Sequence, residues 1–137
     1  MSGFRANGDN SGQRAGAAFP RNLRLLRHAD FRRVYEHGQR HFSANLTVFY
    51  LRREAGAGLR VGFTVGRVLG GAVDRNRIKR RLREAVRLRR PDMQEAVDVV
   101  INPKRSALTA DFAGLQQEVS KAFEVIRHQI KPRKPGP

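Results

Sequence analysis

The residues best suited to chemistry in this sequence are the cations of one short segment, residues 74–90, which reads DRNRIKRRLREAVRLRR. From residue 75 to residue 90, nine side chains are Arg or Lys and only Glu84 is acidic. Clustered cations bind the phosphates of nucleic acids by releasing condensed counterions, and Asn76 adds a directional donor and acceptor near the start of the segment. The segment therefore predicts a binding surface for a polyanion.

The same segment has the apolar period of an amphipathic helix. Four apolar residues recur at helical spacing, namely Ile78, Leu82, Ala85 and Val86. At about 100° per residue they occupy about a third of the helix circumference, which would anchor the helix on a core. The usual explanation of such a charge run is a solvated helix face. In this segment, however, the cations repel one another, and like charges four residues apart destabilise a helix. A solvated face would not need such a cost, so we favour binding of a polyanion.

Candidate catalytic residues are fewer. A metal-dependent nuclease needs clustered carboxylates, and only Asp92, Glu95 and Asp98 lie close together in the sequence. They straddle a predicted helix end and a predicted strand start, so we expect no metal site. Three histidines, at positions 28, 37 and 41, could in principle act as acids or bases on RNA, but they are expected to be exposed RNA-facing or capping residues. We expect no catalytic residue in this chain.

The composition is strongly basic. The 137 residues include 28 Lys and Arg against 12 Asp and Glu, which gives a formal net charge of +16. A charge of this size steers association with nucleic acid or an anionic membrane. The absence of cysteine excludes disulfides, cysteine-bound metals and thiol catalysis. We find no signal-peptide core and no apolar run of about 18 residues, so we expect a cytoplasmic protein.

The segments around the basic helix predict the elements that position it. Residues 30–37 form a helix, and Gly38 lies where a left-handed residue would end it. Residues 42–53 and 59–66 are expected to form an antiparallel hairpin, and residues 96–101 a further strand. Phe49 and Tyr50 would point to opposite faces of their strand, so only one of them can line a binding surface.

Thr109 or Asp111 could cap a last helix. The expected apolar face of this helix, which would lie against the core, consists of Phe112, Leu115, Val119, Phe123 and Ile126 or Ile130. Helices segregated on a small mixed sheet indicate the α+β class. Residues 1–20 and 131–137 lack an apolar period and are expected to be disordered tails. The folded domain is therefore expected to comprise residues 21–130.

Phe31 and Tyr35 lie one helical turn apart and have two interpretations. Such pairs often pack in a core, and Val34 beside them agrees with that. Arg32 and Arg33 flank them, however, and aromatic rings interleaved with arginine suit single-stranded nucleic acid. Both interpretations stay open from the residues alone.

Several motifs together resemble the bacterial ribonuclease P protein family. RNRIKRRLRE at residues 75–84 resembles the signature helix of that family, and LRVGFTV at residues 59–65 resembles the strand before it. Residues 30–38 resemble the first helix of the family, and DVVI at residues 98–101 resembles a later strand. Order and spacing agree over residues 22–130.

The resemblance implies a small single-domain α+β sandwich with a four-stranded mixed sheet, similar to the second domain of a small-subunit ribosomal protein. It implies a left-handed strand–helix–strand crossover, an exception to the usual handedness. It also implies two partners, the catalytic RNA subunit of ribonuclease P and precursor tRNA, whose 5′ leader is removed. Mg²⁺ would be held by the RNA subunit and the substrate. The protein itself would need no cofactor, membrane or small-molecule substrate.

Individual roles follow from the same resemblance. The expected RNA-binding residues are Arg75, Asn76, Arg77, Lys79, Arg80, Arg83 and Arg87. The expected leader-binding cleft between the first helix and the sheet is lined by Phe31, Tyr35, Tyr50, Thr64 and Arg67. The chain departs from the family pattern at residues 66–68 and 102–105, where cations are missing or displaced.

Two alternatives belong to other classes of protein. A structural or ribosomal-type RNA-binding protein would not increase cleavage by the catalytic RNA. An autonomous nuclease would cleave without that RNA and would lose activity when His28, His37 and His41 are changed. A membrane-surface role fits worst, because the basic helix lacks the bulky apolar face that such helices use.

Overall fold

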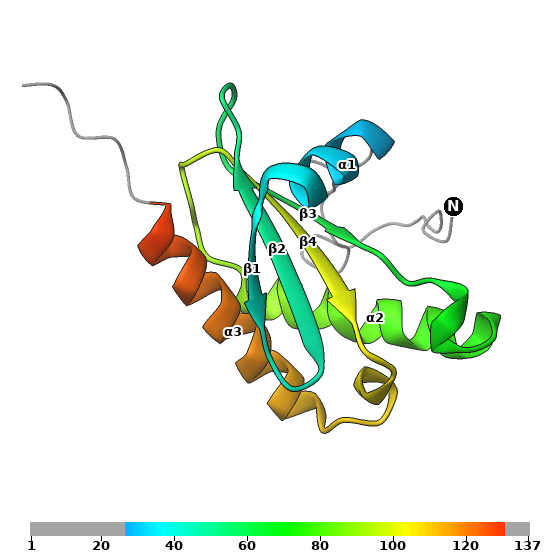
Figure 1. Cartoon of the computed structure of the whole chain (residues 1–137). Coiled ribbons are helices and arrows are strands. Elements are labelled where there is room, and N and C mark those ends of the chain that lie inside the picture. The colour runs from blue at the N-terminus through cyan, green and yellow to red at the C-terminus, as the bar shows by residue number, and fades with distance from the viewer. Residues whose placement is uncertain (1–26, 131–137) are drawn as a thin grey trace, which may run out of the picture.

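The computed structural model describes residues 27–130, which form a four-stranded sheet with helices on both faces (Figure 1). The elements are α1 His28–His37, β1 Gln39–Phe42, β2 Leu46–Arg52, β3 Leu59–Phe63, the 3-10 helix η2 Arg67–Leu69, α2 Ala72–Arg89, β4 Val97–Pro103, the 3-10 helix η3 Arg105–Leu108 and α3 Phe112–Gln129. The predicted α+β class is confirmed. The predicted tails, and residues 21–26 of the predicted domain, lie outside the described residues.

The strands lie in the order β1-β2-β4-β3. β4 pairs antiparallel with β2 and parallel with β3. The predicted antiparallel hairpin of residues 42–53 with residues 59–66 is therefore wrong. β4 is an inner strand of the sheet, with β2 on one edge and β3 on the other. Because helices also cover both faces, β4 is buried on both faces from Val97 to Ile101.

The predicted strand at residues 42–53 is in fact the end of β1, a turn and β2. β1 pairs antiparallel with β2. Glu118 of α3 holds the turn between them, because its Oε1 accepts hydrogen bonds from Ser43 Oγ and Asn45 N, each at 2.9 Å. β1 was not predicted because its sequence, QRHF, is mostly polar.

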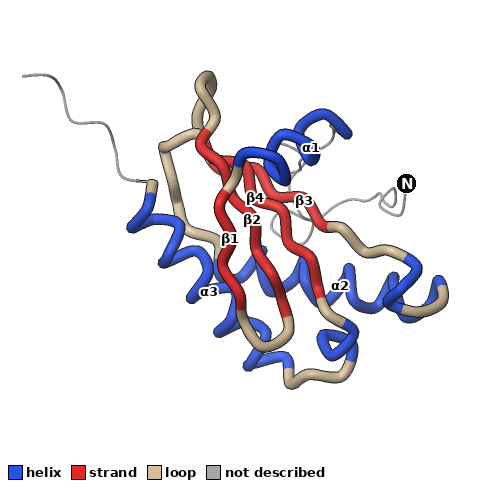
Figure 2. The backbone as a smooth tube through the Cα atoms, viewed as in Figure 1, coloured by secondary structure: helices blue, strands red, loops and turns tan. Residues whose placement is uncertain are grey.

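The two faces of the sheet carry different covers (Figure 2). α2 and α3 enclose the main core on one face, while α1 lies on the other face over a small cluster built on Val34 and Val100. In Figure 1, the arrows of β3 and β4 both point toward the bottom of the view, α2 lies behind them, and the lower end of β3 lies to the right of β4. The β3–α2–β4 crossover is therefore left-handed, as the resemblance implies.

The apolar faces of the long helices are buried as predicted. Ile78, Leu82, Ala85 and Val86 of α2 are fully buried. The buried residues of α3 include Leu115, Val119, Phe123 and Ile126. α2 is thus fixed on the core by the pattern that is visible in its sequence.

Gly38 ends α1, but it is not left-handed. Its backbone is extended, with φ −83° and ψ 173°. Glycine is needed for another reason: a Cβ atom there would lie 2.5 Å from the carbonyl oxygen of Val34 and 2.6 Å from that of Tyr50. Close backbone approach between α1 and β2, rather than a special φ, requires the missing side chain.

Candidate nucleic-acid interface

Two cations of α2 hold the helix in place. Arg81 donates from Nη1 to the carbonyl oxygen of Ala107 at 2.7 Å, and its Nη2 hydrogen-bonds the carbonyl oxygen of Ala110. Arg89 donates from Nε to Gln116 Oε1 of α3 at 3.0 Å. These two arginines join α2 to its neighbours and are less suited than the others to contact a partner.

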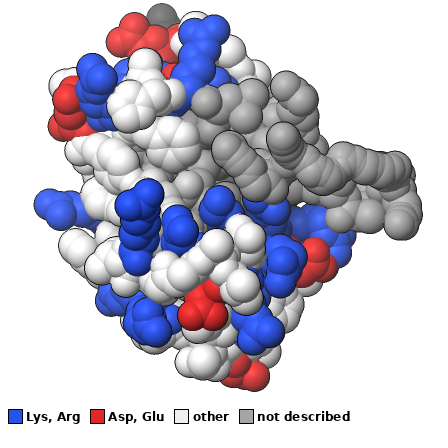
Figure 3. Space-filling view, turned by 90° about the vertical axis from the view of Figure 1, so that its right-hand side faces the viewer, with Lys and Arg blue, Asp and Glu red and all other residues white. Residues whose placement is uncertain are grey.

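The residues predicted to bind RNA occupy the rest of the cationic side, which we call the basic face of α2. Its members are Arg75, Asn76, Arg77, Lys79, Arg80, Arg83 and Arg87. Asn76, Arg77 and Arg80 are exposed, and the other four are half-buried. Figure 3 views the end of the molecule where α2 begins, and Lys and Arg side chains gather across the middle of that face with few acids among them.

The basic face is not uniformly charged. Arg87 donates from Nε to Glu84 Oε1 at 3.0 Å, so the only acid between residues 75 and 90 neutralises one of the cations there. That pairing raises the pKa of Arg87 and lowers the pKa of Glu84. For Lys79 the pKa shifts in the other direction. Burial lowers the pKa of Lys79, and the charges of Arg83 and Arg75 lower it further. The cations of the basic face other than Arg87 all lie between residues 75 and 83.

We expect Lys79→Gln to stabilise the free protein and to weaken its binding to RNA. A lowered pKa means that the protonated amine is less favourable in the folded chain than in the unfolded chain. A neutral amide removes two like-charge contacts, worth about 0.5 kcal/mol in total. A phosphate would favour the protonated amine, so the variant loses one ligand for RNA.

The pH dependence of the free energy of unfolding also tests whether Lys79 is crowded by like charges. As the pH rises through the lowered pKa of Lys79, the unfolded chain retains a proton that the folded chain releases, so the free energy of unfolding rises. This contribution should be missing from the Lys79→Gln variant. Urea unfolding of both proteins from about pH 7 to about pH 10 measures the difference. A variant less stable than the wild type at pH 7 would contradict the expected crowding.

A second surface lies on the sheet face that carries α1. Strand register places Phe42 of β1 opposite Thr47 of β2, and Thr47 opposite Asn102 of β4. Phe63, the last residue of β3, pairs with Ile101 of β4. The next residue, Thr64, therefore lies beside Asn102 and continues this line. We call Phe42, Thr47, Asn102 and Thr64 the open row. Phe42 is 65% exposed and Thr64 is also exposed, so the row is accessible at both ends.

Tyr35 reaches from α1 to the open row. Its hydroxyl donates to Asn102 Oδ1 at 2.8 Å and lies 2.6 Å from Thr64 Oγ1, so the threonine must supply the proton of that second bond. Its ring meets Phe49 edge to face, with centroids 4.9 Å apart. The guanidinium carbon of Arg40 lies 5.8 Å from the centre of the Phe49 ring. Aromatic rings, a guanidinium and polar groups thus converge on an accessible face, a combination that suits unstacked bases.

The structure brings together only part of the predicted leader-binding cleft. Tyr35 and Thr64 are in contact, as described above. Phe31 is half-buried and packs against the small cluster beneath α1. Arg67 is exposed at the start of η2, three residues beyond Thr64.

Tyr50 lies on the opposite face of the sheet. It is only 4% exposed within the main core, and its hydroxyl donates to Gln39 Oε1 at 3.0 Å. Burial raises the pKa of Tyr50. Its neighbour Phe49 takes the face toward α1, so the structure does not join Tyr50 to the open row.

Five residues of this surface were not predicted from the sequence, namely Arg40, Phe42, Thr47, Phe49 and Asn102. The alternation of side chains along a strand offered Phe49 as the alternative to Tyr50. Arg40 and Phe42 belong to β1, which the sequence pattern did not reveal. The predicted last strand ended at residue 101, whereas β4 continues through Asn102 to Pro103.

The candidate catalytic groups do not form one site. His28 and His37 occupy the two ends of α1, about 13 Å apart along the helix axis. His41 pairs with Val48 and faces the main core. Asp98 is buried among arginines. Within residues 27–130, no three His, Asp or Glu side chains are arranged to hold a metal ion.

None of the helices in the described part of the chain is long and apolar enough to cross a membrane.

The chain is similar to known proteins of one family. The profile of the Ribonuclease P family matches residues 19–127. The ribonuclease P protein component of Symbiobacterium thermophilum is 43% identical over 101 residues, which cover 74% of this chain and 88% of that protein. The protein of the same name from Oleidesulfovibrio alaskensis is 46% identical over 115 residues, covering 80% of this chain and 90% of the relative.

A solved structure of the Staphylococcus aureus RNase P protein superposes with a TM-score of 0.67 at 25% identity, covering 77% of this chain and 95% of that one. A second structure of the Staphylococcus aureus protein gives a TM-score of 0.62 at 28% identity and covers 80% of this chain and 95% of that one. Sequence and fold therefore agree over most of the chain. This protein belongs to the ribonuclease P protein family.

Proposed function

We propose that this chain binds both the catalytic RNA of ribonuclease P and the 5′ leader of precursor tRNA, and thereby assists endonucleolytic removal of the leader. The observation that carries the proposal is the pairing of two surfaces of different chemistry on one small domain. One is the basic face of α2, and the other is the open row with Tyr35. A protein that bound only structured RNA would have little use for an accessible aromatic face.

The open row is suited to a single strand. Bases can stack on Phe42 or beside Phe49, and Arg40 can contribute through its guanidinium, which lies 5.7 Å from the centre of the Phe42 ring. The amide of Asn102 is oriented by Tyr35: because its oxygen accepts from the tyrosine, its nitrogen is directed to donate elsewhere. The row therefore offers stacking and hydrogen-bond donation to unpaired nucleotides.

The basic face of α2 is suited to the phosphates of a folded RNA. Its concentrated charge gives affinity that depends steeply on salt and little on sequence. The helix is rigidly held by its buried apolar side and by Arg81, so bound phosphates would be held at fixed positions. Thr64 and Arg67 connect the two surfaces along the chain, so one RNA assembly can contact both.

The chemistry is assigned to the RNA partner. We propose that Mg²⁺ bound by the catalytic RNA and the substrate would activate the water that hydrolyses the phosphodiester, and that no residue of this chain is catalytic. The protein would contribute by holding the leader so that the scissile phosphate stays near that metal, which lowers the entropic cost of reaching the reactive arrangement. Such a role places the protein in the cytoplasm.

Binding of substrate to the reconstituted RNA–protein complex tests the proposal. The complex should bind precursor tRNA more tightly than the same tRNA without its leader, on the order of 10-fold or more, because stacked leader bases add binding energy. The catalytic RNA without protein should show a much smaller difference. Equal affinity of the complex for both RNAs would contradict leader binding by this chain.

A further inference from the structure

We infer that Asp98 is a positioning residue for leader binding: its buried carboxylate fixes α1, and therefore Tyr35, over the sheet. This inference rests on the proposed function. It concerns a residue that lies outside the open row and outside the basic face of α2. Asp98 would act through the placement of α1 and not by touching RNA.

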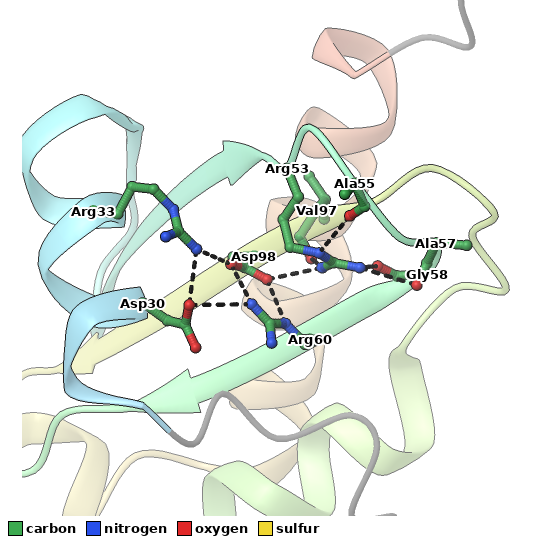
Figure 4. A network of polar contacts seen from close by, with 9 residues as sticks. All are labelled: Asp30, Arg33, Arg53, Ala55, Ala57, Gly58, Arg60, Val97 and Asp98. Atoms are coloured by element: carbon green, nitrogen blue, oxygen red, sulfur yellow. Dashed lines mark hydrogen bonds and ion pairs between the residues drawn. The ribbon is translucent and has the colours of Figure 1, made fainter.

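Asp98 is the centre of an ion-pair network between α1 and the sheet (Figure 4). It is fully buried in β4, on the face of the sheet that carries α1. Arg60 of β3 donates from Nε to Oδ1 and from Nη2 to Oδ2, both at 2.8 Å. Arg53, just after β2, donates from Nη1 to Oδ1 at 2.8 Å. The carboxylate is therefore held rigidly by two strands on either side of its own.

α1 joins this network through Asp30 and Arg33. The Nη2 atom of Arg33 lies 2.8 Å from Asp30 Oδ1 and 3.5 Å from Asp98 Oδ2. The Nη2 atom of Arg60 lies 3.4 Å from Asp30 Oδ1. Figure 4 shows Asp30 and Arg33 pointing from the helix toward Asp98. Two carboxylates thus hold three guanidinium groups together across the boundary between helix and sheet.

Besides this network and the contacts of Tyr35, α1 has few contacts within residues 27–130. The helix has 10 residues, and isolated helices of this length are not stable in water. Val34 is its only buried apolar residue, and it packs on the small cluster of Val100. The main core lies on the other side of the sheet and does not include α1. The network is therefore a large part of what sets the position of α1.

Removing the charge of Asp98 would leave three guanidinium groups facing the single carboxylate of Asp30. Their mutual repulsion would displace Arg33 and with it α1, because Arg53 and Arg60 are fixed in the sheet. Tyr35 follows Arg33 by two residues, and its bonds to Thr64 and Asn102 leave little room for displacement. Loss of that geometry would weaken leader binding while α2 stays in place on the main core.

The test compares Asp98→Asn with the wild type in the complex with catalytic RNA. The affinity for precursor tRNA should fall about tenfold, as expected for partial loss of base stacking. The affinities for leaderless tRNA and for the catalytic RNA should be unchanged. Glu124→Gln is a control matched in charge, because it changes a carboxylate to an amide at an exposed position of α3, outside the open row and the basic face of α2. It should leave all three affinities unchanged.

A double-mutant cycle with Tyr35→Ala separates positioning from a general loss of stability. If Asp98 acts through Tyr35, the double variant should bind precursor tRNA no more weakly than Tyr35→Ala alone. Additive losses, or equal losses for precursor tRNA and catalytic RNA, would overturn the inference. If Asp98→Asn does not fold, Arg33→Gln tests the same link, since Arg33 is 45% exposed and leaves Asp98 paired with Arg53 and Arg60.

The outcome for the wild type separates this inference from the proposed function. A wild-type complex that does not distinguish precursor from leaderless tRNA would contradict the proposed function itself. A wild-type complex that distinguishes them, together with an Asp98→Asn complex that does so equally well, would overturn only the role of Asp98.

Discussion

A variant carrying Arg80→Ala and Arg83→Ala is expected to bind the catalytic RNA about 100-fold more weakly and with a flatter dependence on salt. Hydrogen bonds to charged groups contribute about 1.5–3 kcal/mol each, so loss of two gives an effect of this order. Each phosphate contact also releases condensed counterion. Removing two cations should therefore reduce the slope of log affinity against log salt by about 1.5. Titration of the RNA at several salt concentrations measures both quantities.

The matched control removes the same charge from another helix. Lys121→Ala with Arg127→Ala lowers the net charge by two on the exposed side of α3, away from the basic face of α2. This variant should show a much smaller loss of affinity and a nearly unchanged slope. Equal behaviour of the two variants would mean that only net charge matters. It would remove the basic face of α2 from the interface.

Phe42→Ala is expected to weaken binding of precursor tRNA by roughly 5- to 100-fold, since stacking on an aromatic side chain contributes about 1–3 kcal/mol per base. The side chain is 65% exposed, so its truncation should have little effect on folding. Binding of leaderless tRNA and of catalytic RNA should not change. Equilibrium binding of the three RNAs to wild type and variant measures the effect.

Tyr50→Phe provides the control for this variant on the other face of the sheet. It removes the hydrogen bond to Gln39 and should lower the free energy of unfolding by about 1 kcal/mol. It should leave the affinity for precursor tRNA unchanged, because Tyr50 lies in the main core. If Tyr50→Phe impaired precursor binding as strongly as Phe42→Ala, the leader would not be bound on the open row.

The parts of the structure that sequence reasoning could predict are those fixed by local pattern. The period of Ile78, Leu82, Ala85 and Val86 defines both the buried side of α2 and, by exclusion, its basic face. The same is true of α3. In these helices, burial and charge are decided by residues three and four apart, so a single segment contains the information.

The parts that could not be predicted depend on contacts between distant segments. The insertion of β4 between β2 and β3 is a choice of partner strand, and no single strand sequence specifies it. The open row exists only because this order places Thr47, Asn102 and Thr64 side by side. The same order surrounds Asp98 with Arg53 and Arg60, so an acid grouped by sequence with Asp92 and Glu95 has a different role.

The resemblance to the ribonuclease P protein family supplied what pattern alone could not, including the left-handed crossover. For single residues on the sheet, the resemblance implied Tyr50 as a residue of the cleft, whereas the structure buries Tyr50 in the main core and places Phe49 beneath α1. Neighbouring residues of a strand point to opposite faces, so a shift of one residue exchanges the two faces.

The most direct test of the central claim is cleavage of precursor tRNA at low Mg²⁺ by bacterial catalytic RNA alone, by this protein alone and by both together. We expect strong cleavage at the 5′ end only when both are present. Cleavage by the protein alone would point to an autonomous nuclease. Cleavage by the RNA that needs higher Mg²⁺ and does not respond to the protein would leave a general RNA-binding protein and contradict the role proposed here.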